Sequence, residues 1–188
     1  KFFSNLTGND GMCPVCLGAG YIEYGGDYHQ SMRVECRECE GTGFNKNLKK
    51  YKIKGKSIFD VWKMTLDEAI DFFEDIDKSI TKVCITASEI MLGHLQIGQA
   101  TATLSGGENI RIKIMKASKS TAKVIGVDEP FKGLSNIEID AVANYLNRIR
   151  EKGKTLIVID HSTGVEDYFS QWIQIENIDN RLIGKQFK

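Results

Sequence analysis

The sequence predicts an α/β protein in which helices cover a parallel β-sheet, with a small cysteine-containing module in front of it. Two nearly continuous apolar runs, residues 124–127 and 156–159, are separated by a helical pattern, as expected for parallel strands joined by a crossover helix. Four of the five cysteines instead form two close pairs in the glycine-rich first part of the chain. We therefore expect a cysteine module over 1–48, a helical connector over 49–98 and a sheet-containing lobe over 99–188.

Composition and charge exclude several classes of protein. The 188 residues are 41% hydrophobic and 27% charged, which is enough apolar material for a core and is not typical of a disordered chain. Lys and Arg number 25 and so do Asp and Glu, so any contact with nucleic acid must be local. No apolar run reaches the roughly 20 residues that cross a bilayer, and the N-terminus lacks the pattern of a signal peptide. We expect a cytoplasmic protein without a membrane partner.

The four paired cysteines predict a metal site. Cys13 and Cys16 form one CxxC unit, Cys36 and Cys39 form another, and 19 residues separate the two units. Zinc prefers four soft ligands in a tetrahedron, and each CxxC turn supplies two thiolates. Each unit continues as Cys-x-Gly-x-Gly, so the backbone can fold back and present amides to the sulfurs. We predict a structural Zn²⁺; free or redox-active thiols are the alternative, and His29 is expected to be a surface residue rather than a ligand.

The connector carries two separate signals. Six lysines and no acidic residue occur between residues 46 and 56, which favours either a contact with DNA phosphates or an ordinary solvated face. Apolar residues then recur at helical spacing over 58–73. Thr65 and Glu68 form a capping box inside that stretch, so we expect two short helices. A less regular bridge is expected over 76–98.

The lobe is predicted to alternate helix and strand. Ser105 and Glu108 form a capping box that opens a helix through about residue 118. Ser135 and Glu138 open a second helix, which ends where Gly153 can adopt a left-handed cap. The two apolar strands flank this second helix, and the runs 172–175 and 181–183 fit a closing pair of strands.

The sequence Leu104-Ser105-Gly106-Gly107-Glu108 resembles the signature motif of ABC-type ATPases. Ser105 begins a helix whose N-terminus presents unpaired N–H groups, and Gly106 and Gly107 allow a phosphate to approach the backbone. A Ser-x-x-Glu pattern alone is only a helix cap. The two glycines argue for more, because they weaken a first turn that does not otherwise need them.

Three further elements follow in the order and spacing of the same ATPases. A strand delivers Asp128 toward a Mg²⁺ ion, and Glu129 lies where a base can orient the attacking water, as in the Walker B element. Gly133-Leu134-Ser135 resembles the D-loop. His161 ends the next strand and resembles the H-loop histidine that touches the γ-phosphate of ATP.

One element of such an ATPase is missing from the sequence, the G-x-x-x-x-G-K-[ST] loop that cradles phosphates. Gly55-Lys56-Ser57 has Lys50 where the first glycine belongs, and Gly153-Lys154-Thr155 has Arg148 there and precedes a strand. The chain also begins with Lys1 instead of Met. We therefore expect the Walker A half to lie upstream in a longer protein, and the 188 residues alone to turn over no ATP.

The combination of a CxxC-x19-CxxC module with a following ABC signature resembles the UvrA family of the ABC excinuclease, damage-sensing ATPases of nucleotide excision repair. The similarity runs from about Phe2 to Trp172 and would make this the C-terminal part of the second ATPase half. Further matching segments are Tyr51-Lys52-Ile53-Lys54-Gly55-Lys56, Met64-Thr65-Leu66-Asp67-Glu68-Ala69, Phe72-Phe73 and Gly98-Gln99-Ala100-Thr101-Ala102-Thr103.

The resemblance implies a dimeric ATPase with composite sites, in which a signature motif faces the Walker A loop of another half or protomer. Ser105, Gly106 and Gly107 would serve one site, while the Walker B residues and His161 would serve another. It also implies double-stranded DNA and a UvrB-type protein as partners.

Departures from the family pattern leave alternatives open. The family usually reads Asp-Glu-Pro-Thr-Thr-Gly-Leu-His where this chain has Phe131, Lys132 and Ser135 at the three differing positions. The stretch after Trp172 also lacks the family's Gly-Pro tail. These differences fit a diverged paralogue, of the sort associated with drug resistance or another role without DNA repair. A non-catalytic zinc module of the DnaJ type is a third possibility, although that family has four such repeats and no ATPase motifs.

Overall fold

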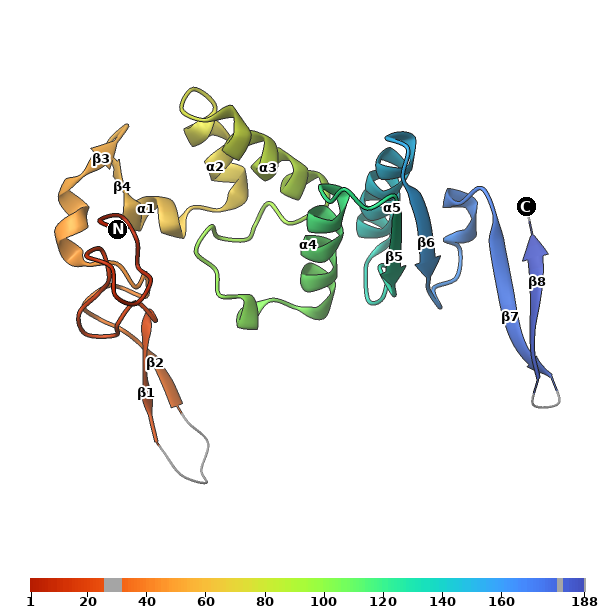
Figure 1. The fold of residues 1–188 in the computed structure, drawn as a ribbon, viewed down its shortest axis with the longest axis horizontal. Coiled ribbons are helices and arrows are strands. Elements are labelled where there is room, and N and C mark those ends of the chain that lie inside the picture. The colour runs from red at the N-terminus through yellow and green to blue at the C-terminus, as the bar shows by residue number, and fades with distance from the viewer. Residues whose placement is uncertain (26–31, 179–180, 188) are drawn as a thin grey trace.

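The computed structural model describes residues 1–25, 32–178 and 181–187. Its parts follow one another along an elongated arrangement: the cysteine module lies at one end, helices α1 to α3 come next, and the lobe with β5 and β6 precedes a C-terminal hairpin (Figure 1). Among the helices of the described residues, none is long and apolar enough to cross a membrane. His29 lies outside the described residues, so its predicted surface position stays a prediction.

The cysteine module contains little regular structure. Strands β1 (Tyr21–Tyr24) and β2 (Met32–Glu35) pair antiparallel, and the short 3₁₀ helix η1 (Lys46–Lys50) follows the second cysteine pair. The four cysteines form a small core of their own together with three apolar side chains from outside the pairs: Phe44, Leu48 and Phe59. Because Phe59 belongs to the connector, this core joins the module to the first connector helix.

The connector begins with a tight hairpin of β3 (Lys52–Ile53) and β4 (Lys56–Ser57), followed by α1 (Ile58–Lys63) and α2 (Leu66–Phe73). Thr65 caps α2 and Glu68 completes the capping box, so the predicted break between two short helices is confirmed. The expectation of an irregular bridge over 76–98 is wrong. Helix α3 (Lys78–Glu89) fills its first half, because the Asp77 side chain accepts hydrogen bonds from the amides of Ser79 and Ile80 and so starts the helix.

The lobe contains the predicted helix and βαβ unit. After η2 (Thr101–Thr103) come α4 (Gly106–Ser118), β5 (Val124–Asp128), α5 (Asn136–Glu151) and β6 (Thr155–Ile159). Strands β5 and β6 are parallel, in a register that pairs Asp128 with Ile159. A second core fills the space between this sheet and the helices; its fully buried members include Ile114, Ile125, Val127, Val142, Leu146 and Ile149.

Helices cover one face of the two-stranded sheet. Ile125 and Val127 of β5 point into the core, whereas Val124 is 56% exposed and Ile159 is 58% exposed. The prediction of strands buried on both faces is therefore wrong for the residues that the structure describes. The apolar residues on the second face nevertheless match the pattern of a sheet that is covered on both sides.

The chain ends in an antiparallel hairpin. After η3 (Glu166–Tyr168), strands β7 (Trp172–Ile178) and β8 (Arg181–Phe187) pair with each other, as expected from their sequence. The rings of Trp172 and Phe187 stack with centroids 4.3 Å apart. The hairpin forms its own two-stranded sheet in the described part of the chain and does not extend β5 and β6.

Candidate zinc module and ATPase site

The structure brings the four paired cysteines together in a geometry that fits zinc. Their sulfur atoms all lie within 4.8 Å of one another, and all four residues are buried. The Sγ atoms of Cys13 and Cys36 are 4.0 Å apart, and those of Cys16 and Cys39 are 3.6 Å apart. Four Zn–S bonds of about 2.3 Å in a tetrahedron place sulfurs roughly 3.8 Å apart. The donor set and its spacing thus suit a closed structural zinc site.

Glycines position the two cysteine turns against each other in a reciprocal way. The amide of Gly20 donates to Cys16 Sγ and the amide of Gly43 donates to Cys39 Sγ, both at 3.2 Å, as predicted from the Cys-x-Gly-x-Gly repeat. A Cβ on Gly20 would lie 2.4 Å from the Gly41 carbonyl oxygen, and a Cβ on Gly43 would lie 2.3 Å from that of Gly18. Both positions therefore require glycine for close backbone contact and for their positive φ angles.

The thiols of this cluster need a cation to ionise. Burial raises the pKa of Cys39 well above its usual value, and burial is also the main cause of the raised pKa of Cys13. A bound divalent cation reverses this effect, because coordination deprotonates a thiol outright. The cluster is therefore suited to a metal rather than to exposed, reactive thiolates.

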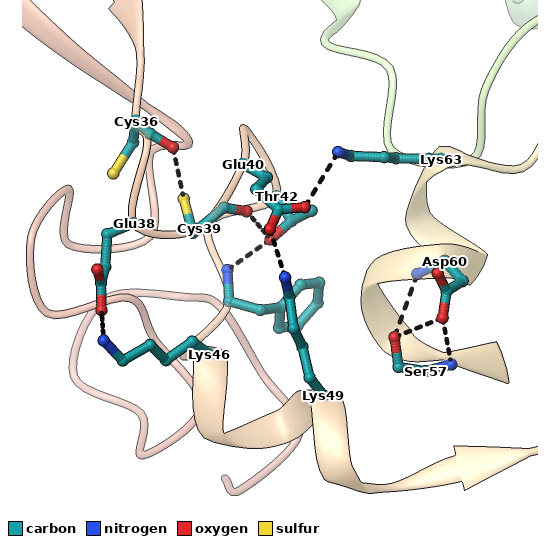
Figure 2. A network of polar contacts seen from close by, with 11 residues as sticks. Cys36, Glu38, Cys39, Glu40, Thr42, Lys46, Lys49, Ser57, Asp60 and Lys63 are labelled. Carbon is teal, nitrogen blue, oxygen red and sulfur yellow. Dashed lines mark hydrogen bonds and ion pairs between the residues drawn. The ribbon is translucent and has the colours of Figure 1, made fainter.

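Acidic residues of the second cysteine turn hold lysines that follow it (Figure 2). Glu38 pairs with Lys46 at 2.7 Å, and Glu40 pairs with both Lys49 and Lys63, which lies 3.5 Å away. Farther along, Lys54 pairs with Asp75. Half of the six lysines between residues 46 and 56 thus have carboxylate partners, which reduces the excess charge of the predicted DNA-contacting stretch.

The signature residues lie at the start of α4, where they line a cavity of about 580 Å³. Ser105 Oγ accepts the Glu108 amide at 3.2 Å, and the Glu108 carboxylate accepts the Ser105 amide at 2.7 Å. A Cβ on Gly106 would meet no atom within 4 Å, and one on Gly107 would come within 3.3 Å of Leu134 Cδ2. The described part of the chain therefore leaves the space over Gly106 free for another group, as a phosphate-approach site requires.

Two charged residues that the sequence did not single out support this turn. His94 Nε2 lies 2.9 Å from Glu108 Oε1, and the hydrogen bond from the Ser105 amide, followed by that from His94, lowers the pKa of Glu108. Arg111 is 4% exposed and donates to Glu138 at 2.9 Å. Its Nε is the one buried side-chain nitrogen or oxygen without a hydrogen-bond partner among the residues that the structure describes.

The predicted Walker B residues lie at the carboxyl edge of the sheet. Asp128 ends β5, and Glu129 adopts a left-handed backbone with φ of 48° while its amide donates to the Ile159 carbonyl at 2.8 Å. Lys132 Nζ lies 2.6 Å from Glu129 Oε2. His161 follows the end of β6, so the register of the parallel strands brings it to the same edge as Asp128. Among the described residues, the lining of the signature cavity does not include Asp128, Glu129 or His161.

Comparisons with known proteins agree with this architecture. The UvrABC system protein A of Rickettsia bellii is 37% identical over 168 residues, which cover 88% of this chain and 17% of that protein. The protein of the same name from Staphylococcus epidermidis is also 37% identical, over 88% of this chain and 18% of its own length. The matched segment belongs to the UvrA family. The crystal structure of UvrA2 from Deinococcus radiodurans superposes on 98% of this chain and 23% of that chain, with a TM-score of 0.84 and 30% identity.

These relationships confirm the resemblance and the fold class that the motifs predicted. The chain spans about a sixth of the length of the curated UvrA relatives that it matches. A scan against models of protein families gave no match.

Within this UvrA-type lobe, Asp160 is another residue that sequence reasoning missed. Its carboxylate accepts hydrogen bonds from the Phe131 amide at 2.9 Å and the Ser162 amide at 2.7 Å. Burial alone would raise the pKa of Asp160, but the hydrogen bonds from Ser162 and Phe131 outweigh it and lower the pKa. Asp160 thus ties the loop after Glu129 to the loop that carries His161. Its position directly before the H-loop histidine was the available signal.

Proposed function

We propose that this chain is the C-terminal part of the second ATPase half of a UvrA-type protein, which couples ATP binding and hydrolysis to engagement of duplex DNA in nucleotide excision repair. The signature turn carries the proposal: Ser105, Gly106 and Gly107 open a capped helix onto a cavity, with free space over Gly106. The N-terminus of a helix offers amides and a positive dipole end to a phosphate. The identity to UvrA proteins supports the same function.

In this proposal, two surfaces of the chain serve different nucleotides. The signature turn binds the phosphates of a nucleotide held by the Walker A loop of another half or protomer, as in a dimer with composite sites. Asp128 holds the Mg²⁺ of a second nucleotide, Glu129 orients the attacking water and accepts its proton, and His161 contacts the γ-phosphate. The bound Mg²⁺ supplies charge stabilisation of the phosphoryl group.

The four cysteines would hold a structural Zn²⁺ in the cytoplasmic protein. Because Phe59 packs in the same core as the cysteines, metal binding orders both the module and the start of the connector. Duplex DNA and a UvrB-type protein are the proposed partners of the complete molecule. A paralogue with another cargo is the second candidate, favoured by Phe131, Lys132 and Ser135 at positions where the family has Thr, Thr and His.

The decisive experiment compares ATP turnover by the full-length protein with that of its Glu129→Gln variant. We expect turnover to fall at least 100-fold while ATP binding is retained, because the amide cannot accept a proton. The isolated 188-residue chain is expected to turn over no ATP. Hydrolysis by the pure chain that disappears in Glu129→Gln would contradict the assignment as a partial ATPase. Repair and paralogue roles separate in a second assay, which measures ATP-dependent affinity for damaged and undamaged duplexes.

A further inference from the structure

Lys132 lies between the two surfaces that the proposed function assigns to different nucleotides. Its Nζ is 2.6 Å from Glu129 Oε2, at the Walker B edge. The same side chain lines the signature cavity together with Ser105, Gly106 and Gly107. One lysine therefore contacts the predicted base of one site and the phosphate-binding surface of the other.

The surroundings of Lys132 allow it to change partner. Its side chain is 69% exposed, and an exposed ion pair is weak because water competes for both charges. Glu129, Asp128 and Asp160 all raise the pKa of Lys132, so the ammonium is kept protonated at this edge. A turn at Gly133, with φ of 72°, follows directly and lets the loop swing back toward α5.

The other charged groups of the cavity are already committed to protein partners. Arg111 is buried and donates to Glu138, and Glu108 is held by the Ser105 amide and His94. Glu138 is in turn held by the amide of Ser135. Arg111 is fixed in place but keeps a buried Nε without a partner among the described residues, and the residue is part of the cavity lining. A phosphate in the cavity would meet the helix N-terminus and the exposed ammonium of Lys132, close to this buried guanidinium.

We propose that Lys132 is a phosphate-binding residue of the signature cavity, and that its move from Glu129 to the phosphate of a docked nucleotide frees the Glu129 carboxylate. This inference rests on the proposed function and adds a residue and a coupling to it. Before docking, the ion pair keeps Glu129 engaged with an ammonium instead of water. Docking of a nucleotide at the signature turn replaces the weak exposed pair by a charge-assisted contact at a helix N-terminus. Occupancy of one composite site thereby changes the base of the other.

The test uses the full-length protein and four variants: Lys132→Met, Lys132→Arg, Glu129→Gln and, as a matched control, Lys113→Met. Lys113 is an exposed lysine on α4 outside the lining of the cavity. We expect Lys132→Met to raise the KM for MgATP about 10-fold, the scale of one charge-assisted contact, while kcat stays within about twofold. We expect Lys132→Arg to restore KM to within about threefold, because it keeps the charge. In Lys132→Met, KM should also become less sensitive to added salt.

Three results would count against the inference or its foundation. A KM for Lys132→Met equal to that of Lys113→Met overturns the phosphate contact. A loss of kcat with unchanged KM also overturns it, since it shows that Lys132 only positions Glu129. If Glu129→Gln retains full turnover, the proposed function itself fails, whatever Lys132 does. Thermal unfolding of each variant shows whether a loss of activity reflects misfolding, and Lys132→Thr, which restores the usual family residue, replaces Lys132→Met if that variant does not fold.

Discussion

The amide of Gly43 donates a hydrogen bond to Cys39 Sγ at 3.2 Å, and the carbonyl of the same glycine accepts one from the Cys13 amide at 2.8 Å. One glycine of the second turn therefore contacts both cysteine pairs. The amide of Gly20 binds Cys16 Sγ and its carbonyl accepts the Cys36 amide in the same way. The two turns thus hold each other, and the sulfurs are placed by backbone groups rather than by the thiols alone.

Replacing Gly43 by Ala should damage the module more than a glycine substitution in open space. The new Cβ would lie 2.3 Å from the Gly18 carbonyl oxygen at a φ of 74°, and a backbone atom cannot move away cheaply. We expect a loss of about 3 kcal/mol in the free energy of unfolding, measured by urea unfolding of the metal-loaded chain. Gly8→Ala is the control, since its φ is 83° but no atom lies within 4 Å of its Cβ. Equal losses for the two variants would contradict this packing argument.

Cys13→Ser should abolish stoichiometric metal binding. Three thiolates and a hydroxyl make a much weaker site than four thiolates, and metal binding is coupled to folding of such modules. We expect elemental analysis to find one zinc per chain in the parent protein and far less in the variant. Proteolysis should become faster within the first 48 residues. Cys84→Ala, at a buried cysteine of α3 outside the cluster, should keep its zinc, and loss of metal there would point to general unfolding.

The pH dependence of stability should carry a contribution from Glu138. Hydrogen bonds from the Ser135 amide, then from Arg111 and the Ser135 hydroxyl, hold the pKa of Glu138 at about 2, below its ordinary value of 4.5. Because the folded pKa is depressed, this stabilisation is present above about pH 4.5 and is lost as pH falls toward 2. We expect Glu138→Gln to lower the free energy of unfolding at pH 6 and to flatten its decline between pH 5 and 2. Glu74→Gln, at an exposed position, should leave the slope of the parent protein unchanged.

The lysines between residues 46 and 56 offer a matched test of DNA binding. Lys46, Lys49 and Lys54 have carboxylate partners, whereas the remaining three are not among the ion pairs found in the described part of the chain: Lys50, Lys52 and Lys56. If the stretch binds duplex phosphates, changing the second set to Gln should reduce the salt slope of binding by about 0.9 for each phosphate no longer neutralised. Changing the first set should have a smaller effect. An unchanged slope in both triple variants of the full-length protein would show that the stretch is only a solvated face.

Local sequence rules predicted the parts of this chain that depend on neighbours along the backbone. The capping boxes at Thr65, Ser105 and Ser135 all form, and β5 and β6 pair in parallel as the apolar runs indicated. Helix α3 was missed because its apolar pattern is weak and its start depends on the single side chain of Asp77. The roles of Ser105, Gly106, Gly107, Asp128, Glu129 and His161 stay predictions that the mutants above test.

The sequence by itself determined the types of groups at each site: four thiols in two turns, a helix that begins with Ser-Gly-Gly, and a strand that ends in Asp-Glu. These follow from residue identity and short spacing, which no tertiary contact alters. Only the tertiary structure decided which groups face each other, because those contacts join residues far apart in the chain. It placed Arg111 against Glu138, His94 against Glu108, and the turn of Lys132 between the Walker B edge and the signature cavity. Packing of α4, α5 and the sheet around one core sets these distances, and no local pattern encodes them.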